Sequence, residues 1–362
     1  MSKSFRASDI DWFLLGLALA IAAVGVMEIY STTLHSPLAG QYRRQIYWIL
    51  LSFVLALVVS RLDYHIVLEQ TPWLYGISVL LLAGLLLLGH SIAGTRRWLQ
   101  FGPMSFQVSE IVKLIIILVV AAYFADRRIK AVTWGDLVKL GIVGGIPAIL
   151  VALEPDLGTA LTFIPIIAAG IIFAGIRWQH IAVLCLTGIL ALPVGWHFLR
   201  PYQRERLMTF VHPAQNTQTS SYQVTQTKIA IGSGGFWGKG LGNGTQSRLG
   251  FIPVSHADSI FAVFAEEQGF VGTLLVLLLY FALLLRLLDG AQMAPDRAGA
   301  FFLVGLAAVL FFQVVINTGM MIGVFPITGI PLPLMSQGGS SLLFTFLGLG
   351  LAMSVRARRY VN

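Results

Sequence analysis

A polar stretch from Gly232 to Gly269 interrupts an otherwise apolar sequence and holds side chains that could do chemistry. It combines eight glycines before residue 251 with charged side chains, which are Lys239, Arg248, Asp258, Glu266 and Glu267. Charge beside lipid is costly, so such a stretch favours a functional explanation. Asp258 stands directly before an apolar run, where a partly buried carboxylate could act as a general base.

A structural explanation of the same stretch stays open. Ser255 and Asp258 have the spacing of an S-x-x-D capping pair that opens a helix, and the glycines could form only a flexible loop. Two phosphate-binding templates fail. Lys239 is followed by Gly240 where a Walker A loop needs Ser or Thr, and no βαβ pattern surrounds the glycines.

Two charged pairs precede this stretch. Arg96 and Arg97 stand before an apolar run that carries Glu110 and Lys113. Because Glu110 and Lys113 are three residues apart, they share one face of a helix. A structural ion pair and a substrate contact both fit this spacing.

Further polar residues flank the next apolar runs. Glu154 and Asp156 lie at a predicted turn, where Asp156 is either a helix N-cap or a site residue. The segment PYQRERL places Arg204 and Arg206 beyond a later run. These cations could anchor a helix at the headgroups, or clamp a phosphate group together with Lys239.

The last polar segment joins prolines to small residues. Three prolines lie between residues 326 and 333 and precede Ser336 and Ser340. A rigid entry into a helix N-terminus is a natural anion site, and a helix cap with close glycine packing is the alternative.

Long apolar runs must position these residues. The 362-residue chain is 57% hydrophobic and 11% charged, which is typical of an integral membrane protein. We expect an all-α, polytopic fold that forms a single membrane domain over residues 1–362. The ten expected helices cover residues 11–30, 45–61, 72–90, 107–125, 137–153, 157–175, 179–199, 259–288, 299–322 and 336–355.

Lysine and arginine predict the orientation of the bundle. Thirteen lie in the segments on the side of the termini, whereas the opposite short loops hold Arg43, Arg44, Arg96 and Arg97. Cytoplasmic loops carry this excess, so both termini are expected in the cytoplasm and residues 200–258 outside. The chain has a net charge of +8, but its lysines and arginines lie at the ends of apolar runs and do not cluster on a soluble face. This distribution argues against nucleic-acid binding.

The charged clusters therefore gather at the outer rim, and not at the midplane where alternating-access carriers bind. This placement suits an enzyme acting on a lipid-linked substrate of the outer leaflet, with arginines that hold a pyrophosphate and Asp258 as base. A transporter that passes the same lipid headgroup across the membrane is the alternative.

Several motifs together resemble one known family. They are GTRRW, SEIVKL, EPDLGTAL, PYQRERL, KIAIGSGGFWGKG, GTQS, HADSIFAVFAEEQG and GIPLPLMSQGGSS. In sequence and order they resemble the bacterial SEDS proteins of shape, elongation, division and sporulation, and the elongation member RodA more than the division member FtsW. The resemblance implies a ten-helix peptidoglycan glycosyltransferase of the bacterial cytoplasmic membrane that polymerises lipid II, with a lipid II flippase as the alternative.

The resemblance also implies roles for residues and partners. Asp258 matches the family's essential aspartate, which is proposed to deprotonate the sugar 4-hydroxyl of the acceptor lipid II while undecaprenyl pyrophosphate leaves. The substrate-binding positions expected are Arg97, Glu110, Lys113, Glu154, Asp156, Arg204, Lys239, Gln246, Ser336 and Ser340. Undecaprenyl-linked glycan, membrane lipids and a class B penicillin-binding protein are the implied partners. A divalent cation such as Mg²⁺ or Mn²⁺ is left open, and no metal ligands are assigned.

Some positions depart from the family pattern. Ala257 and Ser259 flank the aspartate where Thr or Asn and Phe are usual, and Gln337 replaces a Tyr. Val254 and Val108 replace a Glu and a Pro. None of these changes removes a proposed catalytic group.

Overall fold

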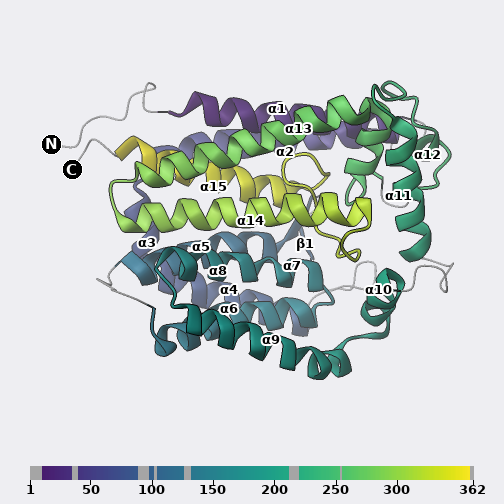
Figure 1. Cartoon of the computed structure of the whole chain (residues 1–362). Helices are drawn as coiled ribbons and strands as arrows, with labels where there is room; N and C mark the ends of the chain where they lie inside the picture. Colours follow the sequence, from purple (N-terminus) through teal and green to yellow (C-terminus); the bar gives the residue numbers. More distant parts are fainter. Residues whose placement is uncertain are drawn as a thin grey trace.

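The computed structural model describes residues 10–34, 40–88, 98–101, 104–125, 132–211, 220–252 and 255–358 as a bundle of helices (Figure 1). The long helices are α1 (Trp12–Thr33), α2 (Gln41–Arg61), α4 (Thr71–Leu88), α5 (Val108–Ala125), α6 (Trp134–Leu153), α9 (Trp178–Phe198), α13 (Ile260–Gln292), α14 (Arg297–Ile322) and α15 (Gly339–Ala357). The shorter helices are α3 (Tyr64–Glu69), α7 (Leu157–Leu161), α8 (Phe163–Phe173), α10 (Pro201–Val211), α11 (Ser220–Gly234) and α12 (Thr245–Arg248).

The predicted helical membrane fold is confirmed. Within the described residues, eight helices are long and apolar enough to cross a membrane, and shorter apolar helices occupy the two other expected spans. Thr162 divides the span expected at 157–175 into α7 and α8. The segment 200–258 contains helices α10 to α12, and a small antiparallel hairpin of β1 (Trp98–Phe101) and β2 (Met104–Gln107) precedes α5.

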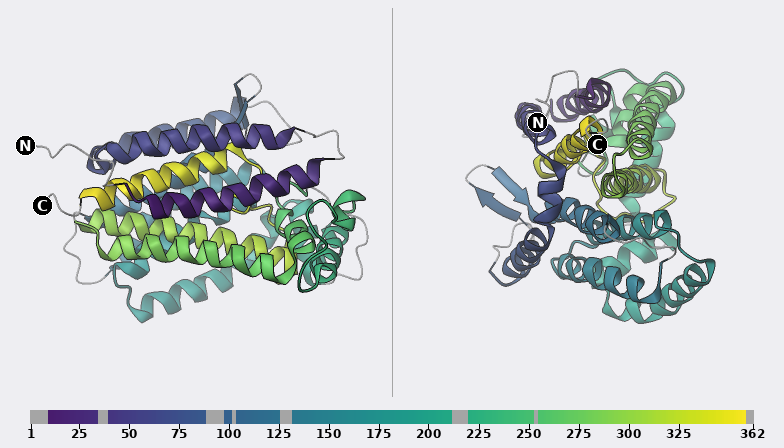
Figure 2. Two further views of the ribbon diagram at one scale, coloured as in Figure 1. Left: turned by 90° about the horizontal axis from the view of Figure 1, so that it is seen from above. Right: turned by 90° about the vertical axis from the view of Figure 1, so that its left-hand side faces the viewer.

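The core lies along α14 and α15. α14 packs against α5, α8 and α13, while α15 packs against α2 and α5, so these helices lie in the middle of the bundle (Figure 2). Aromatic side chains such as Phe302 and Phe344 are fully buried there. In contrast, α9 exposes large apolar side chains, including Leu190 at 65%. An exposed apolar surface on a helix of this length suits contact with lipid.

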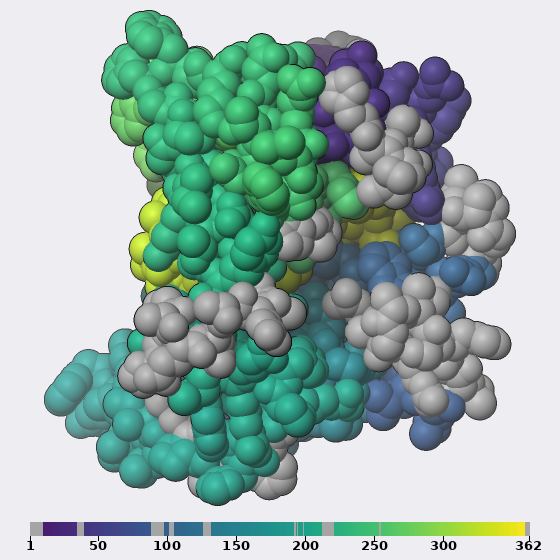
Figure 3. Space-filling model, turned by 90° about the vertical axis from the view of Figure 1, so that its right-hand side faces the viewer, coloured from purple at the N-terminus to yellow at the C-terminus, as the bar shows by residue number. Residues whose placement is uncertain are grey.

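The start of α1 and the end of α15 lie at one end of the bundle, which we name the terminal end. Asp11 caps α1 and accepts hydrogen bonds from Arg286 of α13 (2.9 Å) and Arg356 of α15 (2.8 Å). The helices α10, α11 and α12 lie at the opposite end, which we name the site end (Figure 1). In the view onto the site end, the green surface of α11 to α13 lies beside the teal surface of α9 and α10 (Figure 3).

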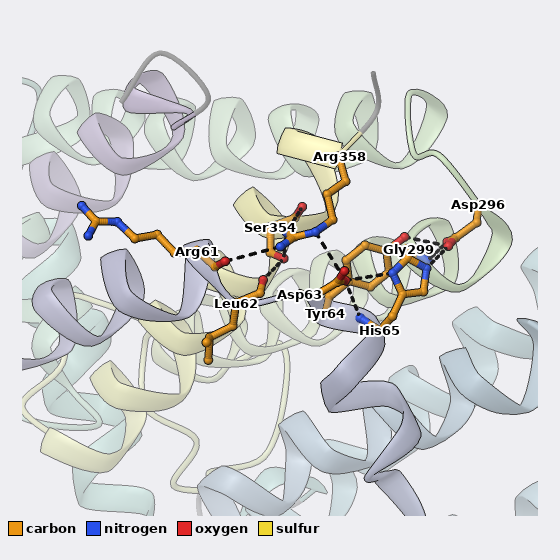
Figure 4. A network of polar contacts seen from close by, with 9 residues as sticks. All are labelled: Arg61, Leu62, Asp63, Tyr64, His65, Asp296, Gly299, Ser354 and Arg358. Atoms are coloured by element: carbon orange, nitrogen blue, oxygen red, sulfur yellow. Dashed lines mark hydrogen bonds and ion pairs between the residues drawn. The ribbon is translucent and has the colours of Figure 1, made fainter. Parts of the chain in front are cut away.

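A second polar cluster at the terminal end joins α3, α14 and α15 around Asp63 and His65 (Figure 4). The two ring nitrogens of His65 lie 2.9 Å from Asp63 Oδ1 and 2.6 Å from Asp296 Oδ2. Arg358 contacts the same Asp63 oxygen at 3.4 Å, and the Tyr64 hydroxyl donates to Asp296 at 2.7 Å. Because both ring nitrogens face carboxylate oxygens, both can donate only when the imidazole is protonated.

These contacts shift the pKa values of the cluster. Burial alone would lower the pKa of His65, but its hydrogen bonds to Asp63 and Asp296 outweigh burial and raise it. Burial alone would raise the pKa of the Asp63 and Asp296 carboxyls, but hydrogen bonds outweigh burial and lower both pKa values. The main donor is the backbone N–H of His65 for Asp63 and the backbone N–H of Gly299 for Asp296. The charged form of each group is therefore favoured in the folded protein.

This cluster predicts a loss of stability at alkaline pH. Because the His65 pKa is raised by folding, its contribution is complete below the unfolded value of about 6.5 and is lost as the pH rises through the folded value. We expect the apparent Tm of the wild type to exceed that of His65→Gln by about 2 °C at pH 6, with the gap closing by pH 9, since half-exposed pairs contribute about 1 kcal/mol at most. Thermal unfolding in detergent, followed by tryptophan fluorescence at one scan rate, measures this gap. A gap independent of pH would contradict the assignment.

Candidate active site

The segment 255–259 brings Asp258 to the site end, directly before α13. The helix begins at Ile260 with Ser259 as its N-cap, and no side chain caps it. Asp258 is therefore not the capping residue of α13, and the S-x-x-D alternative is wrong. Its side chain is half-buried and lines a cavity.

The backbone of this segment is held by the chain between α14 and α15. Three consecutive carbonyls accept hydrogen bonds, two from this chain and one from α14: His256 from Gln337 N (3.1 Å), Ala257 from Ser336 Oγ (2.8 Å) and Asp258 from Asn317 Nδ2 (2.9 Å). Because these bonds engage the backbone, they fix the peptide groups around Asp258.

Asn317 links the segment to the proline-rich loop. Its amide also donates to the Ile330 carbonyl at 2.8 Å, and the residue is fully buried at the site end of α14. Sequence reasoning missed Asn317. The only signal was a polar side chain in an apolar helix that also carries Gln313 and Thr318, and nothing in the sequence indicated partners 13 and 59 positions away.

The cavity measures about 640 Å³ and combines two cations with two carboxylates. Asp258 and Asp156 supply the carboxylates, and Arg200 and Arg206 supply the guanidinium groups. A Cβ atom added at Gly329 would lie 3.4 Å from Asp258 Oδ2 and 4.0 Å from Arg206 Nη1, so both groups approach the same point of the cavity wall. Apolar residues complete the lining, which suits a ligand with both charged and apolar parts.

Asp156 serves the fold and the cavity together. Its carboxylate caps α7 by accepting from Thr159 N (3.1 Å), and it also accepts from Gln107 Nε2 (2.8 Å). The N-cap expectation is thus met, and the same residue lines the cavity. Glu154 is buried nearby as the C-cap of α6.

Of the arginines in PYQRERL, the structure turns Arg206 toward the cavity, while Arg204 lies at the end of α9. Arg204 donates to the carbonyls of Trp196 (3.1 Å) and His197 (2.8 Å), which is a favourable place for a cation at a helix C-terminus. Arg206 donates to the Ile327 carbonyl at 3.2 Å. Arg97 lies outside the described residues.

Glu110 and Lys113 form an ion pair inside the bundle. Lys113 Nζ donates to both carboxylate oxygens of Glu110 at 2.9 Å and lies 4.5 Å from the centre of the Phe344 ring. Both side chains are almost fully buried, and neither lines the cavity. Removing either partner of such a pair typically costs about 3–5 kcal/mol because the other charge stays buried.

The carboxylate of Glu266 in α13 holds the glycine-rich loop against this helix. Glu266 Oε1 accepts from Lys239 Nζ (2.6 Å), Thr245 Oγ1 (3.0 Å) and the backbone N–H of Gln246 (3.2 Å). Lys239 is thus paired with a carboxylate, and Gln246 contributes its backbone. Glu267 of α13 accepts from Ser31 Oγ of α1 at 2.7 Å, and the Gly242 N–H of the loop donates to the same hydroxyl at 3.0 Å.

Two glycines make the contact between this loop and α13. Gly238 and Gly269 have φ values of +81° and +65°, where side chains are strained. A Cβ atom at Gly269 would lie 2.2 Å from Gly238 N, and one at Gly238 would lie 2.2 Å from the Glu267 carbonyl oxygen. Close approach of the two backbones therefore requires glycine at both positions.

The serines expected to contact substrate hold the backbone. Ser336 Oγ donates to the Ala257 carbonyl and accepts from Leu332 N at 2.8 Å, and Ser340 Oγ accepts from Gln107 N at 2.8 Å.

Burial lowers the pKa of His256, so its imidazole is neutral at neutral pH and adds no cation beside Asp258. Among the residues that the structure describes, no group of three or more His, Cys, Asp or Glu side chains is placed to hold a metal ion.

Comparison with known proteins decides the family. The model of the cell cycle protein family that includes FtsW, RodA and SpoVE matches residues 9–361. The chain belongs to this family.

Its relatives agree over nearly the whole length. The chain is similar to the peptidoglycan glycosyltransferase MrdB of Escherichia coli strain K12, with 36% identity over 352 residues that cover 97% of this chain and 94% of the relative. It is also similar to a chain in a structure described as "Structural coordination of polymerization and crosslinking by a peptidoglycan synthase complex" (TM-score 0.83, 34% identity, 98% and 99% covered). The crystal structure of Thermus thermophilus rod shape determining protein RodA matches with a TM-score of 0.73 and 32% identity, covering 97% and 98% of the two chains. The predicted RodA-like SEDS membership is thus confirmed.

The Asn317 bonds predict a local effect on backbone opening. In Asn317→Ala, the carbonyls of Asp258 and Ile330 lose their buried donor, so the segment 255–260 should exchange amide hydrogens about tenfold faster. Hydrogen exchange with mass spectrometry measures this rate. Gln313→Ala is the matched control, because Gln313 is buried one turn earlier in α14 and its amide has no partner among the described residues. Equal exchange in both variants would show that Asn317 does not hold the segment.

Proposed function

We propose that this chain is a peptidoglycan glycosyltransferase that polymerises lipid II, with Asp258 as the general base. The single observation that carries this proposal is the cavity in which the half-buried Asp258 lies near Arg206, in a chain whose relatives have this activity by name. The cavity's mixed lining fits a substrate that joins a sugar, a diphosphate and an apolar chain.

In the proposed reaction, the Asp258 carboxylate takes the proton of the acceptor's sugar 4-hydroxyl. The oxygen attacks the anomeric carbon of the donor strand, a C–O bond forms, and the bond to the diphosphate breaks. Undecaprenyl diphosphate leaves with the electron pair of that bond. Negative charge grows on the leaving group, and the guanidinium groups of Arg200 and Arg206 at the cavity wall would stabilise it.

We also propose that the reaction takes place on the outer side of the cytoplasmic membrane. Asp258 lies at the site end, whereas α1 begins and α15 ends at the terminal end. The lysine and arginine excess of the segments on the side of the termini supports a cytoplasmic terminal end. The site end would then face outward, where lipid-linked precursors are polymerised.

A class B penicillin-binding protein is the partner we propose. The support is the similarity to a chain from a peptidoglycan synthase complex whose description couples polymerisation to crosslinking. A polymerase and a crosslinking transpeptidase would act in succession on one glycan strand.

Asp258→Asn tests the base directly. The amide keeps the shape of the side chain but cannot accept the proton, so glycan polymerisation by the purified protein should fall at least 100-fold. Labelled lipid II and gel separation of glycan chains measure the product, and the Tm should stay within 1 °C. Glu69→Gln, an exposed carboxylate at the end of α3, is the matched control and should polymerise normally.

Two results would count against the proposal. Polymerisation retained by Asp258→Asn would remove Asp258 as the base. Lipid scrambling in vesicles without any polymer from the wild type would favour a transporter.

A further inference from the structure

We propose that a small pocket beside the Asp258 cavity, formed by Arg206 and Lys228, binds a phosphate group. The proposal deepens the proposed function and rests on it, because Arg206 lines both the pocket and the Asp258 cavity. The pocket has a volume of about 80 Å³. A space of this size is larger than the roughly 10–15 Å³ that one water molecule needs, and it has room for a phosphate group.

The pocket and the cavity are neighbours. Arg206, Pro326 and Ile327 line both, so the Arg206 guanidinium forms part of their common wall. A phosphate in the pocket and a reacting group beside Asp258 would therefore share one cation.

The two spaces differ in charge. In the cavity, the charges of two arginines are balanced by Asp156 and Asp258. The pocket is lined by Arg206 and Lys228, and no carboxylate is among its lining residues in the described part of the chain. An anion is thus favoured in the pocket over the cavity.

Hydroxyl groups complete the pocket. Thr209, Ser221 and Thr225 line it, and Thr209 is only 3% exposed. The Thr209 hydroxyl has no hydrogen-bond partner among the described residues. A buried donor without a partner is costly, and a bound phosphate oxygen would satisfy it.

Lys228 is placed by the contact between α11 and α14. Thr227 Oγ1 donates to the Met321 carbonyl at 3.2 Å, which fixes α11 against the end of α14. The Lys228 side chain lies over Gly323, where an added Cβ atom would be 2.4 Å from Nζ. Because Gly323 is the C-cap of α14, stabilisation of the helix end is the alternative role for this cation.

A binding experiment tests the pocket without turnover. The probe is farnesyl diphosphate, titrated against the full chain in phosphatidylcholine nanodiscs and followed by thermophoresis. Lys228→Gln should raise the Kd about tenfold, Lys228→Arg about threefold at most, and Thr209→Val about threefold. Lys139→Gln, which removes an exposed lysine of α6, is the matched control and should leave the Kd unchanged.

The outcomes separate the two roles of Lys228. A raised Kd in Lys228→Gln with an unchanged Tm supports the phosphate site. A wild-type Kd with a lowered Tm shows that Lys228 only stabilises α14 and overturns the proposal. An equal rise in Lys139→Gln also overturns it, because the effect would then be general electrostatics.

A second arm identifies the source of the phosphate. In nanodiscs with one third phosphatidylglycerol, a raised Kd in the wild type but not in Lys228→Gln assigns the pocket to a phospholipid headgroup. An unchanged wild-type Kd assigns it to the diphosphate of the lipid-linked sugar. Asp258→Asn should keep the wild-type Kd, so loss of the proposed reaction and loss of the phosphate site are measured independently.

Discussion

The structure at the site end depends on three hydrogen bonds to consecutive carbonyls. The chain between α14 and α15, together with Asn317, fixes the backbone at residues 256–258. In the role proposed for Asp258, a base must lie within hydrogen-bond reach of the proton it takes, and a displacement of about 1 Å can cost about 100-fold in rate. Fastening the peptide groups meets this requirement with polar partners that α14 and the proline-rich loop supply, and it leaves the carboxylate at the wall of the cavity.

The ion pairs within the bundle are of two kinds. Some join two segments of the chain, and others lie within a single helix. Lys239 and Glu266 fasten the glycine-rich loop to α13, and Asp11 joins three helices at the terminal end. Glu110 and Lys113 pair within α5. In an apolar surrounding, an ionised side chain persists where a partner and hydrogen bonds offset its desolvation. The pairs between segments hold α1, α13 and α15 together at the terminal end and the glycine-rich loop against α13 at the site end.

Sequence reasoning predicted the features that depend on local spacing. Apolar run length gave the helices, the i, i+3 spacing gave the Glu110–Lys113 pair, and the change from polar to apolar sequence located Asp258 at the mouth of a helix. It missed the hairpin before α5 and the break at Thr162, where one apolar run continues through both helices. It also chose Arg204, although Arg206 lines the cavity. Residues two apart lie on different faces of a helix, and only the packing of α10 decides which one turns inward.

The contact of Gly238 with Gly269 restricts how this chain can change. Each position already lacks a side chain, and each faces backbone atoms of the other segment. A larger residue at one position cannot be accommodated by a smaller residue at the other, because no residue is smaller than glycine. Drift at this junction would have to proceed by moving whole backbone segments, which would displace Lys239 from Glu266 at the same time. A substitution at either glycine therefore cannot be compensated by a second substitution at the other.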